Sequence, residues 1–287
     1  TSIEAFGTAV FVNRQAGSQI HLQLGEAPNS PAVPADADTL AYLKSCPHVY
    51  EQGDGMKSLL GIMLTLTASH YPLVLIDEPE AFLHPPQARI LGRRLSQLAP
   101  AGTQVFVATH SSDVLEGMLA DAAVPVTVIR IVRDGDVNRV AVLDNQAIQG
   151  LWGDPLLRFS RALDGLFHTG VCVCESDSDA TFYSAALDAN LTSGQMPAST
   201  IQFVQSGGKD RMDVVIKAMK AVGVSVVAIA DFDVLRDEPT LKKIVVALGG
   251  DWAAVGQQQR LLANDLRGET RNPTAGYIEE ELRKVLE

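Results

Sequence analysis

The segment VCVCESDSDATFY, Val171 to Tyr183, decides how the second half of the chain is interpreted. Its first residues are small and apolar, as in a buried strand, and the acids Glu175, Asp177 and Asp179 come directly after them. Like charges a few ångströms apart raise one another's pKa unless a cation lies between them. We therefore interpret this strand end as part of a metal site. Glu175 and Asp179 lie one helical turn apart, so we expect both to face the same point.

A second apolar run, VVAIADFDV, supplies two more acids, Asp231 and Asp233. The run is long enough for a central strand, and extended geometry would project these two side chains to the same side. If this strand neighbours the one that ends at Glu175, four carboxylates converge at the carboxyl edge of one sheet. Such hard oxygen ligands suit one or two Mg²⁺ or Mn²⁺ ions.

A glycine-rich segment, QSGGKDR, lies between these two runs. Gly207 and Gly208 permit a tight backbone approach, and Lys209 adds a positive charge before a predicted helix. The segment could seat a nucleic-acid phosphate. Taken by itself, it is equally well explained as a glycine turn with a solvated lysine.

In the first half of the chain, LVLIDEPEAFLHP begins with an apolar run that indicates a strand buried on both faces of a parallel sheet. The strand delivers Asp77 and Glu78 to its carboxyl end, where ligands bind in such sheets. Adjacent acids there suit Mg²⁺-nucleotide hydrolysis, in which the first supports the hydrated metal and the second activates the attacking water. His110 comes after another predicted strand and is placed to sense the same γ-phosphate. Each feature alone would more simply be a helix cap.

Composition limits the remaining possibilities. The 287 residues are 46% hydrophobic and 20% charged, as in a globular protein large enough for two domains. The net charge of −11 includes no basic footprint, so contact with nucleic acid would need metal ions or local cations. Cys46, Cys172 and Cys174 lack metal-type spacing and indicate core thiols in a reducing compartment. We find no membrane span or signal peptide, and expect a cytoplasmic protein.

Helices and strands alternate along most of the chain, which predicts an α/β fold. Residues 39–55 carry little pattern, and we place the domain boundary near Gly170, giving domains 1–170 and 171–287. The strands predicted are a hairpin over 9–24, a strand within 71–80, and strands over 104–109, 126–132, 171–174, 201–205 and 225–230. The helices predicted are 56–69, 86–98, 112–120, 178–188 and 209–222, with mostly helix from 231 to the end.

The motifs of the first half resemble ABC-type ATPases of the repair and chromosome-maintenance kind. The resemblance implies a Walker B pair at Asp77 and Glu78, a D-loop over 79–84 and a switch histidine at His110. The segment GDGMKS resembles a degenerate signature motif, with Gly53, Gly55 and Ser58 as further nucleotide-binding residues. In this family the signature motif caps the ATP of a second subunit, which implies a homodimer.

One motif of that family is missing. No G-x-x-x-x-G-K-[ST] phosphate loop occurs, and the GGK at 207–209 lacks the upstream glycine and the following hydroxyl. We therefore expect no ATP hydrolysis by this chain alone. The first residue is Thr1, and the last, Glu287, lies within a helical pattern, so we expect a longer protein that supplies the phosphate loop.

The order ExxxD, GGK and DxD on successive strands resembles the Toprim fold, the metal-binding module of topoisomerases, primases and some nucleases. A Toprim domain behind an ABC-type ATPase resembles the overcoming-lysogenization-defect (OLD) nucleases. This resemblance implies a DNA endonuclease with two-metal phosphodiester hydrolysis, using Glu175, Asp179, Asp231, Asp233 and Lys209 and regulated by ATP in the full-length protein. Asp177 lies off the pattern. The family's late acid and lysine have no clear counterpart, although Asp237, Glu238 and Lys242 are nearby.

Four other interpretations compete with this one. A haloacid-dehalogenase phosphatase would use Asp231 as nucleophile, but too few residues come after the motif for the rest of that domain. A topoisomerase or primase is disfavoured because Tyr183 fits a helix and no other tyrosine is placed as a nucleophile. The main alternative is a non-catalytic, ATP-gated DNA-binding scaffold of the SMC-like class with an inactive Toprim domain, although all four acids are intact. The fourth is an α/β protein whose strand ends are merely capped by acids.

Overall fold

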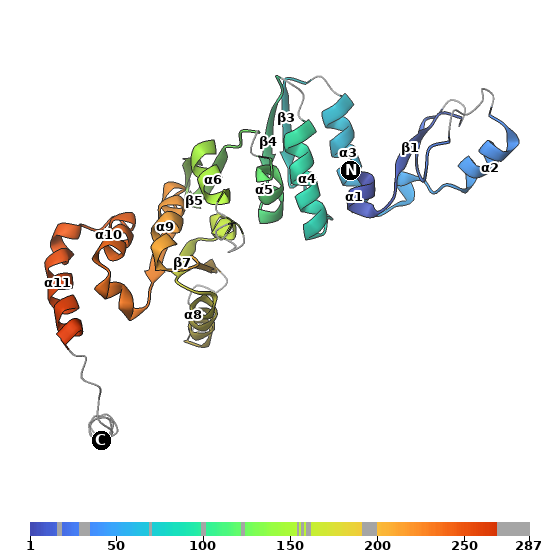
Figure 1. Cartoon of the computed structure of the whole chain (residues 1–287). Coiled ribbons are helices and arrows are strands. Elements are labelled where there is room, and N and C mark those ends of the chain that lie inside the picture. The colour runs from blue at the N-terminus through green and yellow to red at the C-terminus, as the bar shows by residue number, and fades with distance from the viewer. Residues whose placement is uncertain are drawn as a thin grey trace, which may run out of the picture. The chain divides into compact units, whose positions relative to one another are not determined.

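The computed structural model has a mixed α/β architecture, which confirms the predicted class (Figure 1). It describes residues 1–15, 19–28, 35–68, 71–98, 102–121, 124–153, 155, 158, 162–190 and 200–268. The chain forms two compact units: Thr1–Val128 with Leu143–Trp152, and Ile129–Val142 with Gly153–Glu287. Within the described ranges, no helix has both the length and the apolar character needed to cross a lipid bilayer.

The first unit contains a small antiparallel hairpin, a parallel strand pair and the helices around them. Its elements are α1 (Ser2–Phe6), β1 (Val10–Asn13), β2 (His21–Leu24), α2 (Ala37–Ser45), the 3₁₀ helix η1 (Val49–Glu51), α3 (Asp54–Ala68), β3 (Leu73–Asp77), α4 (Pro85–Leu98), β4 (Gln104–Ala108), α5 (Ser112–Leu119) and α6 (Asn145–Trp152). The predicted hairpin is confirmed, with Val10 opposite Leu24 and Asn13 opposite His21.

Helix α2 lies largely within the stretch for which the sequence predicts no clear element. Its start is fixed locally, because the Asp36 carboxylate accepts a hydrogen bond from the Thr39 amide at 2.7 Å. Only Leu43 in this helix is buried, so no apolar stripe of helical period is present for a pattern search to find.

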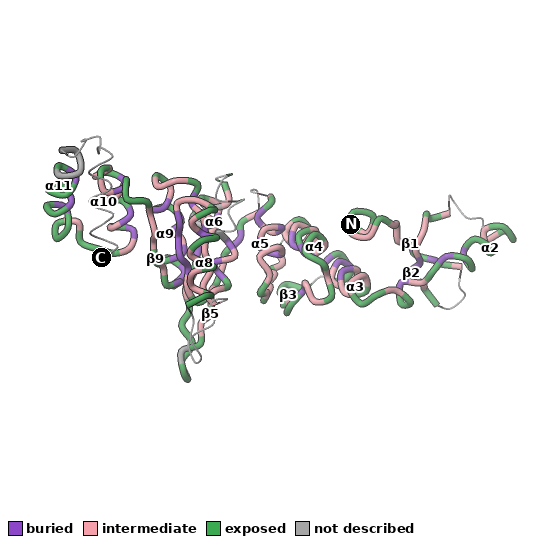
Figure 2. The backbone as a smooth tube through the Cα atoms, turned by 90° about the horizontal axis from the view of Figure 1, so that it is seen from below, coloured by how far each residue is buried: buried purple, intermediate pink, exposed green. Residues whose placement is uncertain are grey.

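Strands β3 and β4 pair in parallel and bring Asp77 beside Ala108. Their core lies on one side, where α3, α4 and α5 contribute buried side chains around Val74: Leu59, Met63, Leu66, Ala88, Leu91, Leu95 and Val114. On the other side Leu75 is 72% exposed and Phe106 is 50% exposed, and Figure 2 shows β3 mostly in the colour of exposed residues. The prediction that β3 is buried on both faces is therefore wrong for the described chain, because only one layer of helices packs on this strand pair.

Two glycines allow α4 and α5 to pack at close range. A Cβ on Gly92 would clash with the backbone carbonyl of Val114, and one on Gly117 would clash with that of Arg89. The same contact is closed at its exposed rim by Arg89, which pairs with Asp113 at 2.7 Å and Glu116 at 2.6 Å. This backbone-to-backbone contact fixes α5 and, with it, the loop that carries His110.

The second unit has a three-stranded parallel sheet at its centre. Its elements are the hairpin strands β5 (Val128–Asp134) and β6 (Val137–Leu143), η2 (Ala162–Phe167), β7 (Gly170–Cys174), α8 (Asp177–Asn190), β8 (Ile201–Gln205), η4 (Lys209–Arg211), α9 (Met212–Ala221), β9 (Ser225–Ile229), η5 (Phe232–Arg236), α10 (Glu238–Ala247) and α11 (Trp252–Gly268). The strand order is β8-β7-β9, and Cys174 aligns with both Gln205 and Ile229. All three strands therefore end at the same edge of the sheet.

Helices α8 and α9 both pack on this sheet, and the buried face of α9 is visible in Figure 2. Cys172 and Cys174 are buried thiols on β7 and pack with Ala180 of α8. Hydrogen bonding to Cys172 and burial raise the pKa of the Cys174 thiol, so this group stays protonated in the core.

Three details of the second unit differ from the sequence-based expectations. The strand predicted over 126–132 is β5, which pairs with β6 in an antiparallel hairpin instead of continuing a parallel alternation. Strand β9 is at an edge of the described sheet and is not central. The helix predicted over 209–222 starts with the 3₁₀ turn η4. The predicted C-terminal helical pattern of residues 269–287 lies outside the described residues.

The hairpin β5–β6 belongs to the second unit because Arg130 anchors it there. The Arg130 guanidinium donates hydrogen bonds to the carbonyls of Leu166, His168 and Gly223 at 2.9–3.0 Å. A charged group that satisfies several backbone acceptors is costly to remove. The predicted boundary at Gly170 thus falls later in the chain than the hairpin that this unit includes.

The close packing of α4 on α5 can be tested with one methyl group. We expect Gly92→Ala to lower the free energy of unfolding by about 1–3 kcal/mol, because backbone must move to make room. Gly61→Ala is the matched control, since a Cβ on this helical glycine meets nothing within 4 Å in the described chain. It should raise the free energy of unfolding by about 0.5–1 kcal/mol. Urea unfolding followed by circular dichroism measures both; equal effects would contradict the proposed packing.

Candidate functional site

The first group of candidate residues lies at the carboxyl edge of the sheet β8-β7-β9. Glu175 comes directly after β7, and its Oε2 accepts a hydrogen bond from the backbone amide of Asp231 at 3.3 Å. The two residues meet because β7 pairs with β9 in parallel, the arrangement on which the expected convergence of the acids depends. A carboxylate of one strand end thus lies against the backbone of the next.

Asp179 and Asp177 have separate roles at the start of α8. Asp179 Oδ2 accepts hydrogen bonds from the Ser176 amide at 3.0 Å and from its hydroxyl at 2.7 Å, while the Asp179 amide donates back to Ser176 Oγ at 3.3 Å. This reciprocal pattern is a capping box. Asp177 is the exposed first residue of the helix. One oxygen of Asp179 is therefore engaged in capping the helix.

Asp233 is not extended beyond β9 as predicted, because it lies in the 3₁₀ helix η5. Its Oδ2 pairs with Lys209 Nζ at 2.6 Å. The hydrogen bond to Asp233 raises the pKa of Lys209, and the charges of Asp237 and Glu175 act in the same direction. The lysine ammonium therefore lies among the acids of this sheet edge.

The loop before Lys209 depends on its glycines. Gly207 and Gly208 have φ values of 74° and 118°, which residues with side chains rarely adopt. The Gly208 amide donates to the Glu175 carbonyl at 3.0 Å, and the Ser206 hydroxyl donates to the Cys174 carbonyl at 3.0 Å. The predicted tight backbone approach is thus an approach to the end of β7.

The carboxylates at this edge of the sheet are suitable ligands for a divalent ion. Their positions in the structure, however, are set by contacts with other groups of the protein. Carboxylates are the ligands that Mg²⁺ and Mn²⁺ prefer, and the Lys209 ammonium is already a cation seated among them. In the described part of the chain, no three His, Cys, Asp or Glu side chains are arranged so that they could hold a metal ion. Two of the acids have other partners: Asp179 Oδ2 accepts a hydrogen bond from Ser176, and Asp233 Oδ2 accepts one from Lys209.

The possible late acids of the sequence have structural contacts. Asp237 Oδ1 accepts a hydrogen bond from the Thr240 amide at 3.2 Å and caps α10. Glu238 pairs with Arg260 at 3.4 Å. Lys242 lies on α10, one turn beyond its start.

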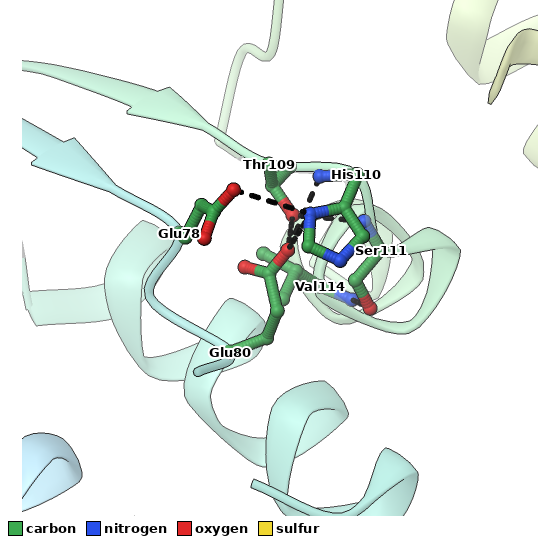
Figure 3. A network of polar contacts seen from close by, with 6 residues as sticks. All are labelled: Glu78, Glu80, Thr109, His110, Ser111 and Val114. Atoms are coloured by element: carbon green, nitrogen blue, oxygen red, sulfur yellow. Dashed lines mark hydrogen bonds and ion pairs between the residues drawn. The ribbon is translucent and has the colours of Figure 1, made fainter. Parts of the chain in front are cut away.

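The second group of candidate residues lies in the first unit, where β3 and β4 end (Figure 3). Asp77 is the last residue of β3, and Glu78 comes next with a φ of 43°. His110 Nδ1 lies 3.7 Å from Glu78 Oε1 and 3.4 Å from Glu80 Oε1. Both Glu78 and His110 are largely exposed, so a ligand could reach them.

Glu80 is a residue of this group that the sequence analysis does not single out. Its Oε1 accepts hydrogen bonds from the Thr109 hydroxyl at 2.7 Å and the His110 amide at 3.1 Å (Figure 3). Only 9% of its side chain is exposed, and Oε2 is buried without a hydrogen-bond partner among the described residues. The spacing of the acids in DEPE does not indicate that one of them, Glu80, is buried. The carboxylate joins the loop after β3 to the loop after β4.

The segment compared with a signature motif lies at the start of α3. The Gly53 carbonyl accepts hydrogen bonds from the Met56 and Lys57 amides, and Ser58 is in the first turns of the helix. A Cβ on Gly55 would clash with the carbonyl of Phe82, whose own φ is 66°. The start of α3 therefore packs directly on the loop that contains Glu80.

Two parts of the chain match known families. Residues 48–116 match the family described as "AAA domain, putative AbiEii toxin, Type IV TA system", and residues 166–233 match "Overcoming lysogenization defect protein-like, TOPRIM domain". The first match includes the candidate residues from Gly53 to His110. The second includes those from Glu175 to Asp233.

Individual relatives cover the same parts. The chain is 27% identical over 171 residues to the Old nuclease of Escherichia phage P2, which is 58% of this chain and 28% of that protein. It is 33% identical over 94 residues to a "Putative ABC transporter ATP-binding protein" of Methanosarcina acetivorans, a third of each sequence. The chain thus spans about a third or less of these relatives.

Among solved structures, one from work on ATP-driven dimerization and DNA-stimulated activation of SMC ATPases aligns with a TM-score of 0.35 and 13% identity. The alignment covers 50% of this chain and 79% of that one.

The role of Glu80 can be tested through the amides that it holds. Glu80→Ala should lower the free energy of unfolding by about 1–3 kcal/mol, because it removes the acceptor of two hydrogen bonds. It should also speed hydrogen exchange at the His110 amide, measured by NMR. Glu80→Gln keeps an acceptor oxygen and should retain most of that protection. Glu78→Gln is the exposed control. Unchanged exchange in Glu80→Ala would show that Glu80 does not hold this loop.

Proposed function

Because the chain belongs to the OLD-like family, with an AAA-type ATPase segment followed by a Toprim domain, we propose that it is part of a metal-dependent DNA endonuclease. The observation that supports this most directly is the contact between Glu175 and the Asp231 amide, which joins the ends of two parallel strands within the Toprim match. Similarity to the Old nuclease supports the same reaction class.

In this proposal Glu175, Asp179, Asp231 and Asp233 hold one or two Mg²⁺ or Mn²⁺ ions. When bound, such ions supply an activated water and stabilise the oxygen that leaves the phosphodiester. The protein's own contribution is to present four carboxylates from β7, α8 and the segment after β9. One oxygen of two of these carboxylates is already engaged within the protein: Asp179 Oδ2 with Ser176, and Asp233 Oδ2 with Lys209.

DNA contact is proposed for Gly207, Gly208 and Lys209. Gly207 and Gly208 carry no side chains, so a phosphate can approach the backbone closely there, and Lys209 supplies charge. The net charge of −11 gives the chain a net electrostatic repulsion from a DNA backbone. Binding should therefore depend on divalent ions, and a single lysine–phosphate contact predicts only a shallow dependence on added salt.

For the first unit we propose a nucleotide site that is incomplete in this sequence. Asp77, Glu78 and His110 lie together at the end of β3 and β4, and Gly53, Gly55 and Ser58 line the start of α3. Since no phosphate loop occurs in the sequence, ATP hydrolysis is proposed only for a longer protein that contains one. There, ATP would regulate cutting, and two copies would pair as a homodimer.

Plasmid nicking tests the nuclease assignment. With Mg²⁺ or Mn²⁺ and without ATP, we expect the chain to nick supercoiled DNA weakly. Glu175→Gln and Asp231→Asn should each lower the rate by about two orders of magnitude, the scale of a lost electrostatic or proton-transfer contribution. Asp188→Asn, at an exposed acid near the far end of α8, is the matched control and should cut normally.

The nicking assay also distinguishes the proposed nuclease from the main alternative, a non-catalytic scaffold. Full cutting by Glu175→Gln would sink the assignment of the site. Metal-dependent DNA binding by the wild-type chain without any cutting would favour the ATP-gated scaffold with an inactive Toprim domain. The observation in favour of this alternative is that Asp179 and Asp233 each use an oxygen to accept a hydrogen bond within the protein, from Ser176 and Lys209.

A further inference from the structure

Lys209 is a cation at the acidic edge of the second unit. Its ammonium lies 2.6 Å from Asp233 Oδ2, and its side chain is 23% exposed whereas that of Asp233 is 60% exposed. Asp237 and Glu175 are close enough to add to the attraction that it experiences. The Lys209 charge therefore offsets repulsion among three acids: Glu175 after β7, Asp233 in η5 and Asp237, which caps α10.

The backbone holds Lys209 in this place. Gly207 and Gly208 turn the chain through positive φ values, and the Gly208 amide is bonded to the carbonyl of Glu175. The 3₁₀ turn η4 then begins at Lys209, and the Arg211 amide donates to the Gly208 carbonyl at 3.2 Å. The lysine is thus presented from a loop that is bonded to the same strand end as Glu175.

We propose that Lys209 is an internal counter-cation, which pairs with Asp233 when no divalent ion is bound and is displaced from it when an ion binds. The released ammonium is then available to a DNA phosphate. This inference rests on the proposed metal site and adds to it a competition between a protein cation and the metal. By linkage, a divalent ion should raise the affinity for DNA, and DNA should raise the affinity for the ion by the same factor.

The competition follows from charge. An Asp233 oxygen that accepts a short hydrogen bond from an ammonium is not free to coordinate a metal, and the ammonium repels a divalent cation nearby. Removing the lysine charge should therefore favour metal binding. A lysine that merely held Asp233 in position would have the opposite effect, because its loss would disorder a ligand.

Isothermal titration with Mn²⁺ alone separates these cases without any assay of cutting. We expect Lys209→Met to bind Mn²⁺ about three- to tenfold more tightly than wild type, a modest factor because exposed charges are screened. Lys209→Arg keeps the charge and should bind as wild type does. Lys217→Met is the matched control: Lys217 also pairs with an aspartate at 2.6 Å, but with Asp213 on α9.

If wild type binds Mn²⁺ and Lys209→Met binds it with the same or a lower affinity, the proposal that Lys209 is a counter-cation is wrong. If neither wild type nor any variant binds Mn²⁺, the proposed metal site itself fails. Thermal unfolding of each variant checks that it is folded.

The second arm tests the release of the ammonium. Fluorescence anisotropy of a labelled DNA duplex should show an increase in affinity on adding Ca²⁺ that is larger for wild type than for Lys209→Met. An equal increase in both would show that the lysine does not pass from the acid to the phosphate.

Discussion

Parallel pairing of β7 with its two neighbours is the constraint on which the second unit depends. Because parallel strands run in the same direction, their ends meet at one edge, and the residues immediately after each strand gather there. In this sheet those residues are Glu175, the glycine turn at 207–208, and Asp231. Gathering acids is unfavourable unless positive charge or donors offset them. The Asp231 amide, the Ser176 capping box and the Lys209 ammonium do this in the structure.

The first unit handles a similar problem with a buried acid. Glu80 accepts hydrogen bonds from the loop after β4 while it sits in the loop after β3, and Gly55 brings the start of α3 onto the same loop. Glu78 and Phe82 both have positive φ values without being glycine. Such conformations each cost about 1–3 kcal/mol and persist only where surrounding contacts impose them. Strain, a buried acid and the exposed His110 therefore occur within one short region, which is where the proposed nucleotide site lies.

The sequence predicts the regular elements well wherever an apolar pattern or a turn residue marks them. The strands around Val173 and Val227 and the helices α4 and α8 are found close to their predicted bounds. It fails where the decision is made by packing. Helix α2 has one buried residue and hence no stripe, and β5 pairs with β6 in a hairpin that Arg130 attaches to carbonyls distant in the chain. Leu75 is exposed because, in the described chain, helices cover only one face of β3. A run of apolar residues in the sequence does not show how many faces of a strand are covered.

For the candidate sites, the sequence by itself determined which residue types come after which strands: acids after β3, β7 and β9, and a glycine pair before Lys209. It determined this because strand direction and chain order are encoded locally, in apolar runs and turn residues. Only the tertiary structure decided which partner each polar group takes. Asp179 turns to Ser176, Asp233 leaves the extended strand for η5 and meets Lys209, and Glu80 is buried against Thr109. These choices depend on distances between segments that are tens of residues apart, and such distances are set by packing and electrostatics across the fold.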